Sequence, residues 1–132
     1  MPTLNSATLS ITIDRPWTEV YDFASDPANL SQWAAGLGSG FERSGDKWTF
    51  HDPSGNPVTM TFAERNDLGV LDHDVYVGDQ IVHMAMRVVP NGDGAEVTLL
   101  VLQLPDMSDA DFARDQGAVR KDLDKLKAVL EA

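Results

Sequence analysis

The sequence predicts an α+β fold in which a curved antiparallel sheet, two short helices and a long C-terminal helix share one core. Three observations support this prediction. Residues 8–14 alternate polar and apolar side chains as a half-buried strand does, residues 41–104 repeat that alternation between turn sequences, and residues 109–131 place apolar side chains at helical spacing. A sheet with one apolar face and a helix with one apolar stripe bury both by packing together. We therefore expect the long helix to lie across the concave face of the sheet.

Two short helices are expected after the first strand. The segment 16–24 begins with a proline and carries apolar side chains at helical spacing. The pair Asp26 and Pro27 is typical of a second helix start, with Asp26 as the N-cap and Pro27 at the first helical position. This second helix should carry Leu30 and Trp33 on one side.

Six further strands are expected in the middle of the chain. Turn sequences rich in glycine, proline, aspartate and asparagine separate short alternating segments there. The run Asn91-Gly92-Asp93-Gly94 is a strong hairpin signal. Strands joined by such short turns are antiparallel. The predicted strands cover residues 41–44, 47–51, 58–65, 70–77, 81–89 and 95–104.

The last element has the clearest helical pattern. Ser108 stands at the position of an N-cap with Asp111 three residues later, so we expect a helix over residues 109–131. Acidic residues near its start and Lys125 and Lys127 near its end suit the helix dipole. Its apolar stripe consists of Phe112, Val119, Leu123, Leu126 and Leu130.

Length and charge limit the classes of function. The 132 residues fit one domain that spans positions 1–132. Ten basic against 21 acidic residues give a net charge of −11. Phosphate backbones and anionic lipid surfaces should repel such a chain, because binding to either depends on clustered Lys and Arg. We therefore expect no nucleic-acid binding and no charge-driven membrane binding.

The chemistry of cysteine and metal sites is also restricted. The chain has no cysteine, which excludes disulfides, thiolate nucleophiles and cysteine-ligated metal centres. Its three histidines fall on different predicted strands and faces and show no metal-ligand spacing. We expect neither a metal nor a cofactor. Because residues 1–14 lack the pattern of a signal peptide, we expect a cytoplasmic protein.

Several segments resemble a known superfamily. Residues 11–23 read ITIDRPWTEVYDF, residues 26–33 read DPANLSQW and residues 122–127 read DLDKLK. These segments resemble the START-like or SRPBCC superfamily, whose helix-grip (Bet v 1-like) fold has the element order predicted above. Residues 67–73 and 86–94 are also similar to a bacterial subgroup, and bacterial members are often called polyketide cyclase/dehydrase-like.

The resemblance implies a function but leaves alternatives open. The superfamily includes lipid carriers, other ligand binders, aromatase/cyclases and co-chaperones. We expect binding or carriage of a small hydrophobic molecule, lipid- or polyketide-like, in a cavity between the sheet and the C-terminal helix. One alternative is a polyketide cyclase/dehydrase-type enzyme. Another is a protein-interaction module, co-chaperone-like or toxin-like, with a filled core; an edge strand could also support a homodimer.

His73 is the candidate catalytic residue. On its predicted strand it shares a side with Leu71, Val75 and Val77, so it should point into the apolar interior. A histidine there could act as general acid and base on a bound carbonyl compound, because the histidine pKa lies near neutrality. The alternative is a core histidine whose ring is satisfied by a backbone carbonyl or a neighbouring acid.

A set of aromatic and methionine side chains is predicted to face the same interior. Flexible thioethers beside aromatic rings suit an adaptable hydrophobic pocket, and they suit an ordinary filled core equally well. The resemblance favours the pocket. Glu64 and Gln103 could add polar atoms to it, although Glu64 near a strand end also suits a solvated position. The candidate ligand-binding residues are Trp33, Trp48, Phe50, Met60, Phe62, Glu64, His73, Met84, Met86 and Gln103.

Overall fold

A computed structural model of the protein describes residues 2–37 and 40–132. Its seven strands form one sheet in the order β1-β7-β6-β5-β4-β3-β2, in which every neighbouring pair is antiparallel. The strands are β1 (Ser6–Ile13), β2 (Phe41–Ser44), β3 (Lys47–His51), β4 (Pro57–Phe62), β5 (His73–Val77), β6 (Gln80–Asn91) and β7 (Gly94–Leu102). The helices are α1 (Trp17–Ala24), α2 (Asp109–Glu131) and two 3₁₀ helices, η1 (Pro27–Gln32) and η2 (Ala35–Leu37). The predicted α+β helix-grip architecture is confirmed.

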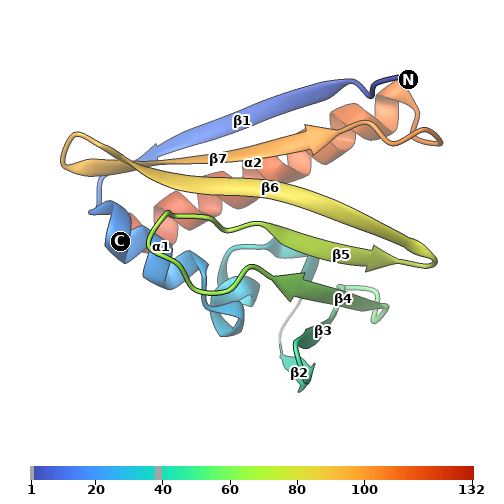
Figure 1. Cartoon of the computed structure of the whole chain (residues 1–132), viewed down its shortest axis with the longest axis horizontal. Helices are drawn as coiled ribbons and strands as arrows, with labels where there is room; N and C mark the ends of the chain where they lie inside the picture. The colour runs from blue at the N-terminus through green and yellow to red at the C-terminus, as the bar shows by residue number, and fades with distance from the viewer. Residues whose placement is uncertain (1, 38–39) are drawn as a thin grey trace.

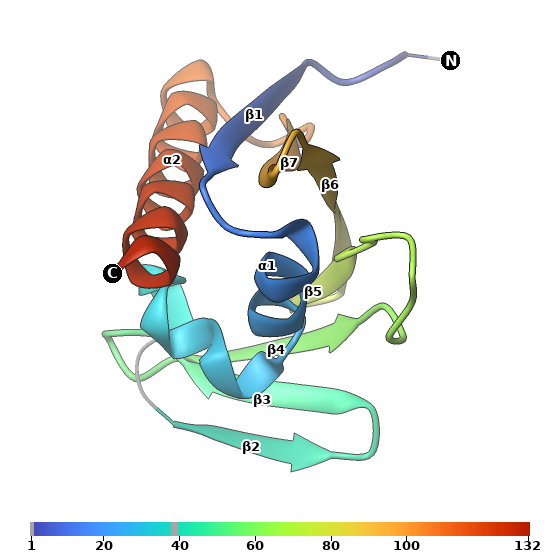
Figure 2. The same ribbon diagram turned by 90° about the vertical axis from the view of Figure 1, so that its left-hand side faces the viewer.

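The sheet is strongly curved. Figure 1 shows β1, β7 and β6 side by side, with α2 behind them and β5 to β2 continuing below. Viewed from the end in Figure 2, the sheet curls around α1, and α2 runs along the open side of the curl. In Figure 1, α1 lies at one end of the molecule and the turn between β5 and β6 lies at the other end.

The register places the predicted apolar side chains on one face. Directly opposed residues in an antiparallel sheet project to the same side. Trp48 is opposite Met60, and Met60 is opposite Val75. Farther along the sheet, Met86 is opposite Leu99. The largest side chains that are almost completely buried in the core are Phe50, Ile13, Leu123, Leu126, Val20, Val88 and Val97.

Helix α2 is attached to β1. Its N-cap is Ser108, whose hydroxyl oxygen accepts a hydrogen bond from the N–H of Asp111 at 3.0 Å, as the capping pattern predicts. Farther along the helix, Arg120 donates to the carbonyl of Ser10 at 2.9 Å and Lys127 donates to the carbonyl of Thr12 at 2.8 Å. These bonds hold α2 along the edge of the sheet formed by β1. The space between α2 and the strands β5 and β6 is therefore lined by shorter side chains.

Three of the expected elements differ in detail. The second helix begins at Pro27 with the carboxylate of Asp26 accepting the N–H of Ala28, as expected, but it is a 3₁₀ helix followed by a second 3₁₀ turn.

The two strands predicted at 58–65 and 70–77 are shorter than expected, because the first ends at Phe62 and the second begins at His73. The reason for the shorter strands is the side chain of Asn66. It bonds to the carbonyls of Glu64 and Val70 and to the N–H groups of Leu68 and Val70, so the backbone there leaves the sheet.

Candidate functional site

Two apolar cavities lie between the inner face of the sheet and α2. The smaller cavity measures about 310 Å³ and is bounded by η1, η2, β4, β5 and the middle of α2. The larger measures about 560 Å³ and extends toward the turn between β5 and β6. Both are lined by Val75, Met84, Val119 and Asp122, so they adjoin at these residues. Together they form an elongated space of the size of ordinary ligand sites.

Short side chains account for this space. Figure 2 shows that the sheet curls away from α2 as it passes from β1 through β7 and β6 to β5. At that place the facing side chains are Val75 and Val82 on the sheet and Ala118 and Val119 on the helix. None of these is long enough to fill the gap, whereas Leu126 farther along α2 is completely buried and lines neither cavity.

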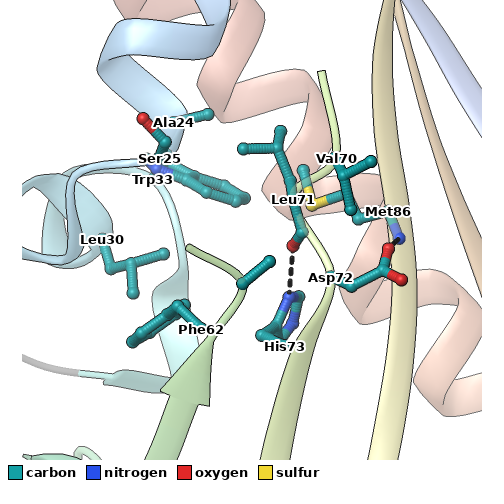
Figure 3. Close-up of a pocket in the computed structure, with 11 residues that line it drawn as sticks. Ala24, Ser25, Leu30, Trp33, Phe62, Val70, Leu71, Asp72, His73 and Met86 are labelled. Atoms are coloured by element: carbon teal, nitrogen blue, oxygen red, sulfur yellow. Dashed lines mark hydrogen bonds between the residues drawn. The ribbon is translucent and has the colours of Figure 1, made fainter. Parts of the chain in front are cut away.

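His73 lies at the wall of the smaller cavity, opposite Phe62 on β4 and Met84 on β6. Its Nδ1 atom is 3.0 Å from the carbonyl oxygen of Leu71 (Figure 3). A carbonyl oxygen only accepts hydrogen bonds, so Nδ1 carries the proton and Nε2 is left with a lone pair. Within residues 2–37 and 40–132, Nε2 has no hydrogen-bond partner. Burial lowers the pKa of His73 below the ordinary histidine value, which keeps the ring neutral.

Trp33 forms part of the same wall. It is buried, and its Nε1–H has no partner among the described residues. Figure 3 places its ring beside Ala24 and Ser25, at a small cavity of about 20 Å³ that His73 also lines. We therefore assign Trp33 to the wall and to the attachment of η1 to α1.

Asp122 is the acidic group at the junction of the two cavities. One of its carboxylate oxygens accepts the N–H of Ala35 at 3.1 Å, which ties η2 to α2. Partial burial raises the pKa of Asp122 above the ordinary aspartate value, and the bond from Ala35 opposes this effect. The carboxyl group thus stands in a mostly apolar wall.

Comparison with known proteins identifies the family. A family model described as polyketide cyclase / dehydrase and lipid transport matches residues 5–131. The chain belongs to this family. The superfamily resemblance predicted from the sequence is thereby confirmed. A search of curated proteins finds no match.

Three solved structures of similar fold are distant from this chain in sequence. An uncharacterised protein from Bacillus thuringiensis has a TM-score of 0.79 at 14% identity, covering 97% of this chain and 100% of that chain. The Aha1 dimer from Colwellia psychrerythraea has a TM-score of 0.77 at 12% identity, covering 96% of each chain. DynU16, from the dynemicin biosynthetic locus, has a TM-score of 0.75 at 16% identity, covering 99% of this chain and 48% of that chain. At these identities the likeness concerns the fold.

The structure brings six of the predicted pocket residues together at the smaller cavity and the small space beside it. Trp33, Met60, His73 and Met84 line the smaller cavity. Phe62 and Met86 line the small space beside it that is drawn in Figure 3.

The remaining predicted pocket residues do not line either of the two cavities. Phe50 is completely buried in the core, and Trp48 packs against Phe41 on β2. Glu64 is exposed in the loop after β4 and lines neither cavity. Gln103 lies beyond the end of β7, and its side-chain amide bonds to Asn5, to the carbonyl of Met107 and to Asp109. It therefore closes the loop before α2 instead of facing a ligand.

The sequence-based prediction missed Asp122 and Val119. Both lie on α2 and line both cavities. The signal that could have found Asp122 is helical spacing, because it falls three residues after Val119 and four before Leu126, within the apolar stripe. An acidic residue in such a stripe is unusual enough to indicate a special environment.

The outer face of the sheet carries a separate polar cluster. His83 pairs with Asp74 at 2.7 Å and with Asp72 at 3.4 Å. In the described ranges no group of three or more histidine, aspartate or glutamate side chains is arranged so that it could hold a metal ion. No helix among the described residues is long and apolar enough to cross a membrane.

Proposed function

We propose that the chain binds and carries a small hydrophobic molecule in the two adjoining cavities between the sheet and α2. The observation that supports this proposal most is the space itself, about 310 and 560 Å³, with walls made mainly of valine, leucine, alanine and methionine side chains. Natural ligand pockets are typically about 300–1,000 Å³ and predominantly apolar. The family description, which includes lipid transport, agrees with this function.

An entrance is available at the end of the molecule opposite α1. Val77 and Ile81 flank the turn between β5 and β6, and both line the larger cavity. They are 56% and 63% exposed, which is high for apolar side chains of this size. An apolar rim lowers the cost of moving a hydrophobic molecule from water into the cavity. We therefore place the entry route at this turn.

The proposal is tested by blocking the junction of the cavities. Nile red, a neutral apolar dye, should bind the protein saturably with a rise in fluorescence. The Val119→Trp variant should lose this binding, because the indole would occupy space that both cavities share. The matched control is Val89→Trp, since Val89 is an exposed residue of β6 that lines neither cavity. Undiminished binding by a folded Val119→Trp protein would show that the dye binds elsewhere.

Native mass spectrometry gives an independent reading. Freshly purified protein that retains a few hundred daltons of extra mass, released on denaturation, would carry a natural ligand. The same spectrum reports the oligomeric state, which bears on the homodimer expected as an alternative. The alternative of a protein-interaction module predicts a filled core, and two cavities of this size argue against a filled core.

A second candidate function is polyketide cyclase/dehydrase-type catalysis. The observation that favours it is the neutral His73 ring at the cavity wall with Nε2 as a free base. In such a reaction Nε2 takes a proton from the carbon beside a ketone, and the resulting enolate attacks a second carbonyl carbon of the same molecule. The imidazolium then returns the proton to the new alkoxide oxygen.

The two functions predict different behaviour of His73→Gln. If the protein is an enzyme, the His73→Gln variant should no longer cyclise a poly-β-keto thioester, although it should still bind Nile red. If the protein is a carrier, neither the wild type nor the variant should catalyse cyclisation, and the affinity for the dye should change little. Cyclisation that persists in His73→Gln at the wild-type rate would end the His73 mechanism.

A further inference from the structure

The charged side chains that line the two cavities are mainly carboxylates. None of the described residues that line either cavity is a lysine or an arginine, while Asp115 and Asp122 supply carboxylates. His83 also borders the larger cavity, but its ring is held by Asp74 and Asp72, so two carboxylates offset any positive charge on it. The net charge of −11 adds to the same field. An anionic ligand would therefore enter a cavity of negative potential.

Asp122 lacks a cationic partner. A few acids in the protein are paired, such as Asp111 with Arg114 and Glu131 with Lys127. For Asp122, no described lysine or arginine lies within salt-bridge distance, and the N–H of Ala35 occupies only one of its carboxylate oxygens. The remaining oxygen can accept a hydrogen bond from a molecule in the cavity.

Among the described residues, those that line the smaller cavity offer acceptors and no accessible side-chain donor. Its polar lining side chains are Trp33, His73 and Asp122. His73 presents Nε2 as an acceptor because Nδ1–H is engaged with Leu71. The Nε1–H of Trp33 is covered by its neighbours, leaving less than 1 Å² of that atom accessible. A ligand therefore gains affinity by donating a hydrogen bond to this wall, and a ligand that carries a carboxylate loses affinity.

We infer that the ligand is an uncharged, mainly apolar molecule that carries a hydroxyl or similar hydrogen-bond donor, and that Asp122 discriminates against carboxylate-bearing lipids such as free fatty acids. This inference rests on the proposed function, since it specifies the class of molecule that the cavities hold. Hydrogen bonds to a charged group are stronger than neutral ones, so the donor should contribute about a tenfold gain in affinity.

Three probes of one skeleton test the inference: 4-octylphenol, 4-octylanisole and 4-octylbenzoate. Each is titrated at pH 8 against the protein loaded with Nile red, and its affinity is taken from displacement of the dye. Octylphenol should bind about tenfold more tightly than octylanisole, which lacks the donor. Octylbenzoate should bind at least tenfold more weakly than octylanisole, because its charge is repelled.

The Asp122→Asn variant assigns the selectivity to one residue. It keeps an oxygen for the N–H of Ala35 and removes the charge, so the affinity of octylbenzoate relative to octylanisole should rise. The control Asp124→Asn makes the same change of net charge on an exposed position of α2 that lines neither cavity, and it should leave all three affinities unchanged. Octylanisole is measured on the same Asp122→Asn protein, so a change in cavity shape affects both affinities and does not by itself change their ratio.

The outcomes separate this inference from the proposed function. If neither Nile red nor any octyl probe binds, the proposed function fails. If all three probes bind with similar affinity, or octylbenzoate binds most tightly, the cavity exists but the inference is overturned. An effect of Asp124→Asn equal to that of Asp122→Asn would attribute the selectivity to overall charge and overturn the role of Asp122.

Discussion

At the level of single residues, Gly69 joins the loop after β4 to β6 through its backbone. Its carbonyl accepts the N–H of Val88 at 2.9 Å, and its φ of +72° lies in the left-handed region that favours glycine. A Cβ atom at this position would overlap the carbonyl oxygen of Val88, which belongs to the backbone and has little freedom to move. The loop that leads into His73 therefore depends on glycine at this position.

We expect Gly69→Ala to lower the free energy of unfolding by about 3 kcal/mol or more, from backbone strain and the overlap together. Urea denaturation measures the change. The control is Gly117→Ala, because Gly117 lies in α2 with open space around it, and alanine there should raise the free energy of unfolding by about 0.5–1 kcal/mol. Equal effects at both positions would contradict the role assigned to Gly69.

The two histidines that flank the β5–β6 pairing should respond to pH in opposite directions. Burial lowers the pKa of His73, so below about pH 6.5 the unfolded chain takes up a proton more readily than the folded protein, and stability falls as the pH falls. The hydrogen bond to Asp74 raises the pKa of His83, so its stabilising effect is present below about pH 6.5 and is lost as the pH rises through the folded pKa. The His83 effect should be small because the side chain is exposed.

This pH dependence is measured as the free energy of unfolding between pH 5 and pH 8. As the pH falls toward 5, His73→Gln should lose less free energy of unfolding than the wild type does. His83→Gln should lack the small gain in the free energy of unfolding that the wild type has at acidic pH. A His73→Gln protein with the same pH slope as the wild type would show that the ring is not desolvated in solution.

At the level of elements, α2 is positioned by its ends and by one edge of the sheet. The cap at Ser108 fixes where the helix begins, and near its C-terminus Arg15 donates to the carbonyl of Leu130 at 2.9 Å. The N–H of Asp14 donates to Glu131 at 2.8 Å. Since these contacts hold α2 against β1, the cavity opens on the side of the helix that faces β5 and β6.

Loss of the cap should weaken α2 without moving it. We expect Ser108→Ala to reduce the free energy of unfolding by about 1 kcal/mol, because the N–H of Asp111 loses its acceptor. Ser108→Asp supplies another acceptor and should stay within a few tenths of a kcal/mol of the wild type. Thermal or urea denaturation gives both values, and a cap that contributes nothing would leave all three proteins alike.

At the level of the whole molecule, the negative charge opposes compaction. The net charge is −11 at pH 7 and the pI is about 4.4. Like charges repel one another in the folded state, and salt screens that repulsion. The same charge that disfavours anionic ligands therefore makes stability depend on ionic strength.

We expect the Tm at pH 7.5 to rise by a few degrees when NaCl is increased from about 10 mM to about 300 mM. At pH 4.5, close to the pI, the same change of salt should have a much smaller effect, because little net charge remains to be screened. Circular dichroism melting curves at the four conditions measure this. A salt effect of equal size at both pH values would have to come from a source other than net charge.

The sequence alone determined the order of strands and helices, where η1 and α2 begin, and which alternate residues of the strands face inward. These follow from local rules: Ser108 and Asp26 cap their own helices, and the alternation around Met60, His73 and Met84 decides which side chains face inward. Only the tertiary structure decided that the inner face leaves a cavity, that Gln103 closes a loop and that Asp122 stands at the junction. The physical reason is distance: periodicity gives the direction of a side chain, whereas the gap between α2 and the curved sheet depends on how far the whole sheet curls.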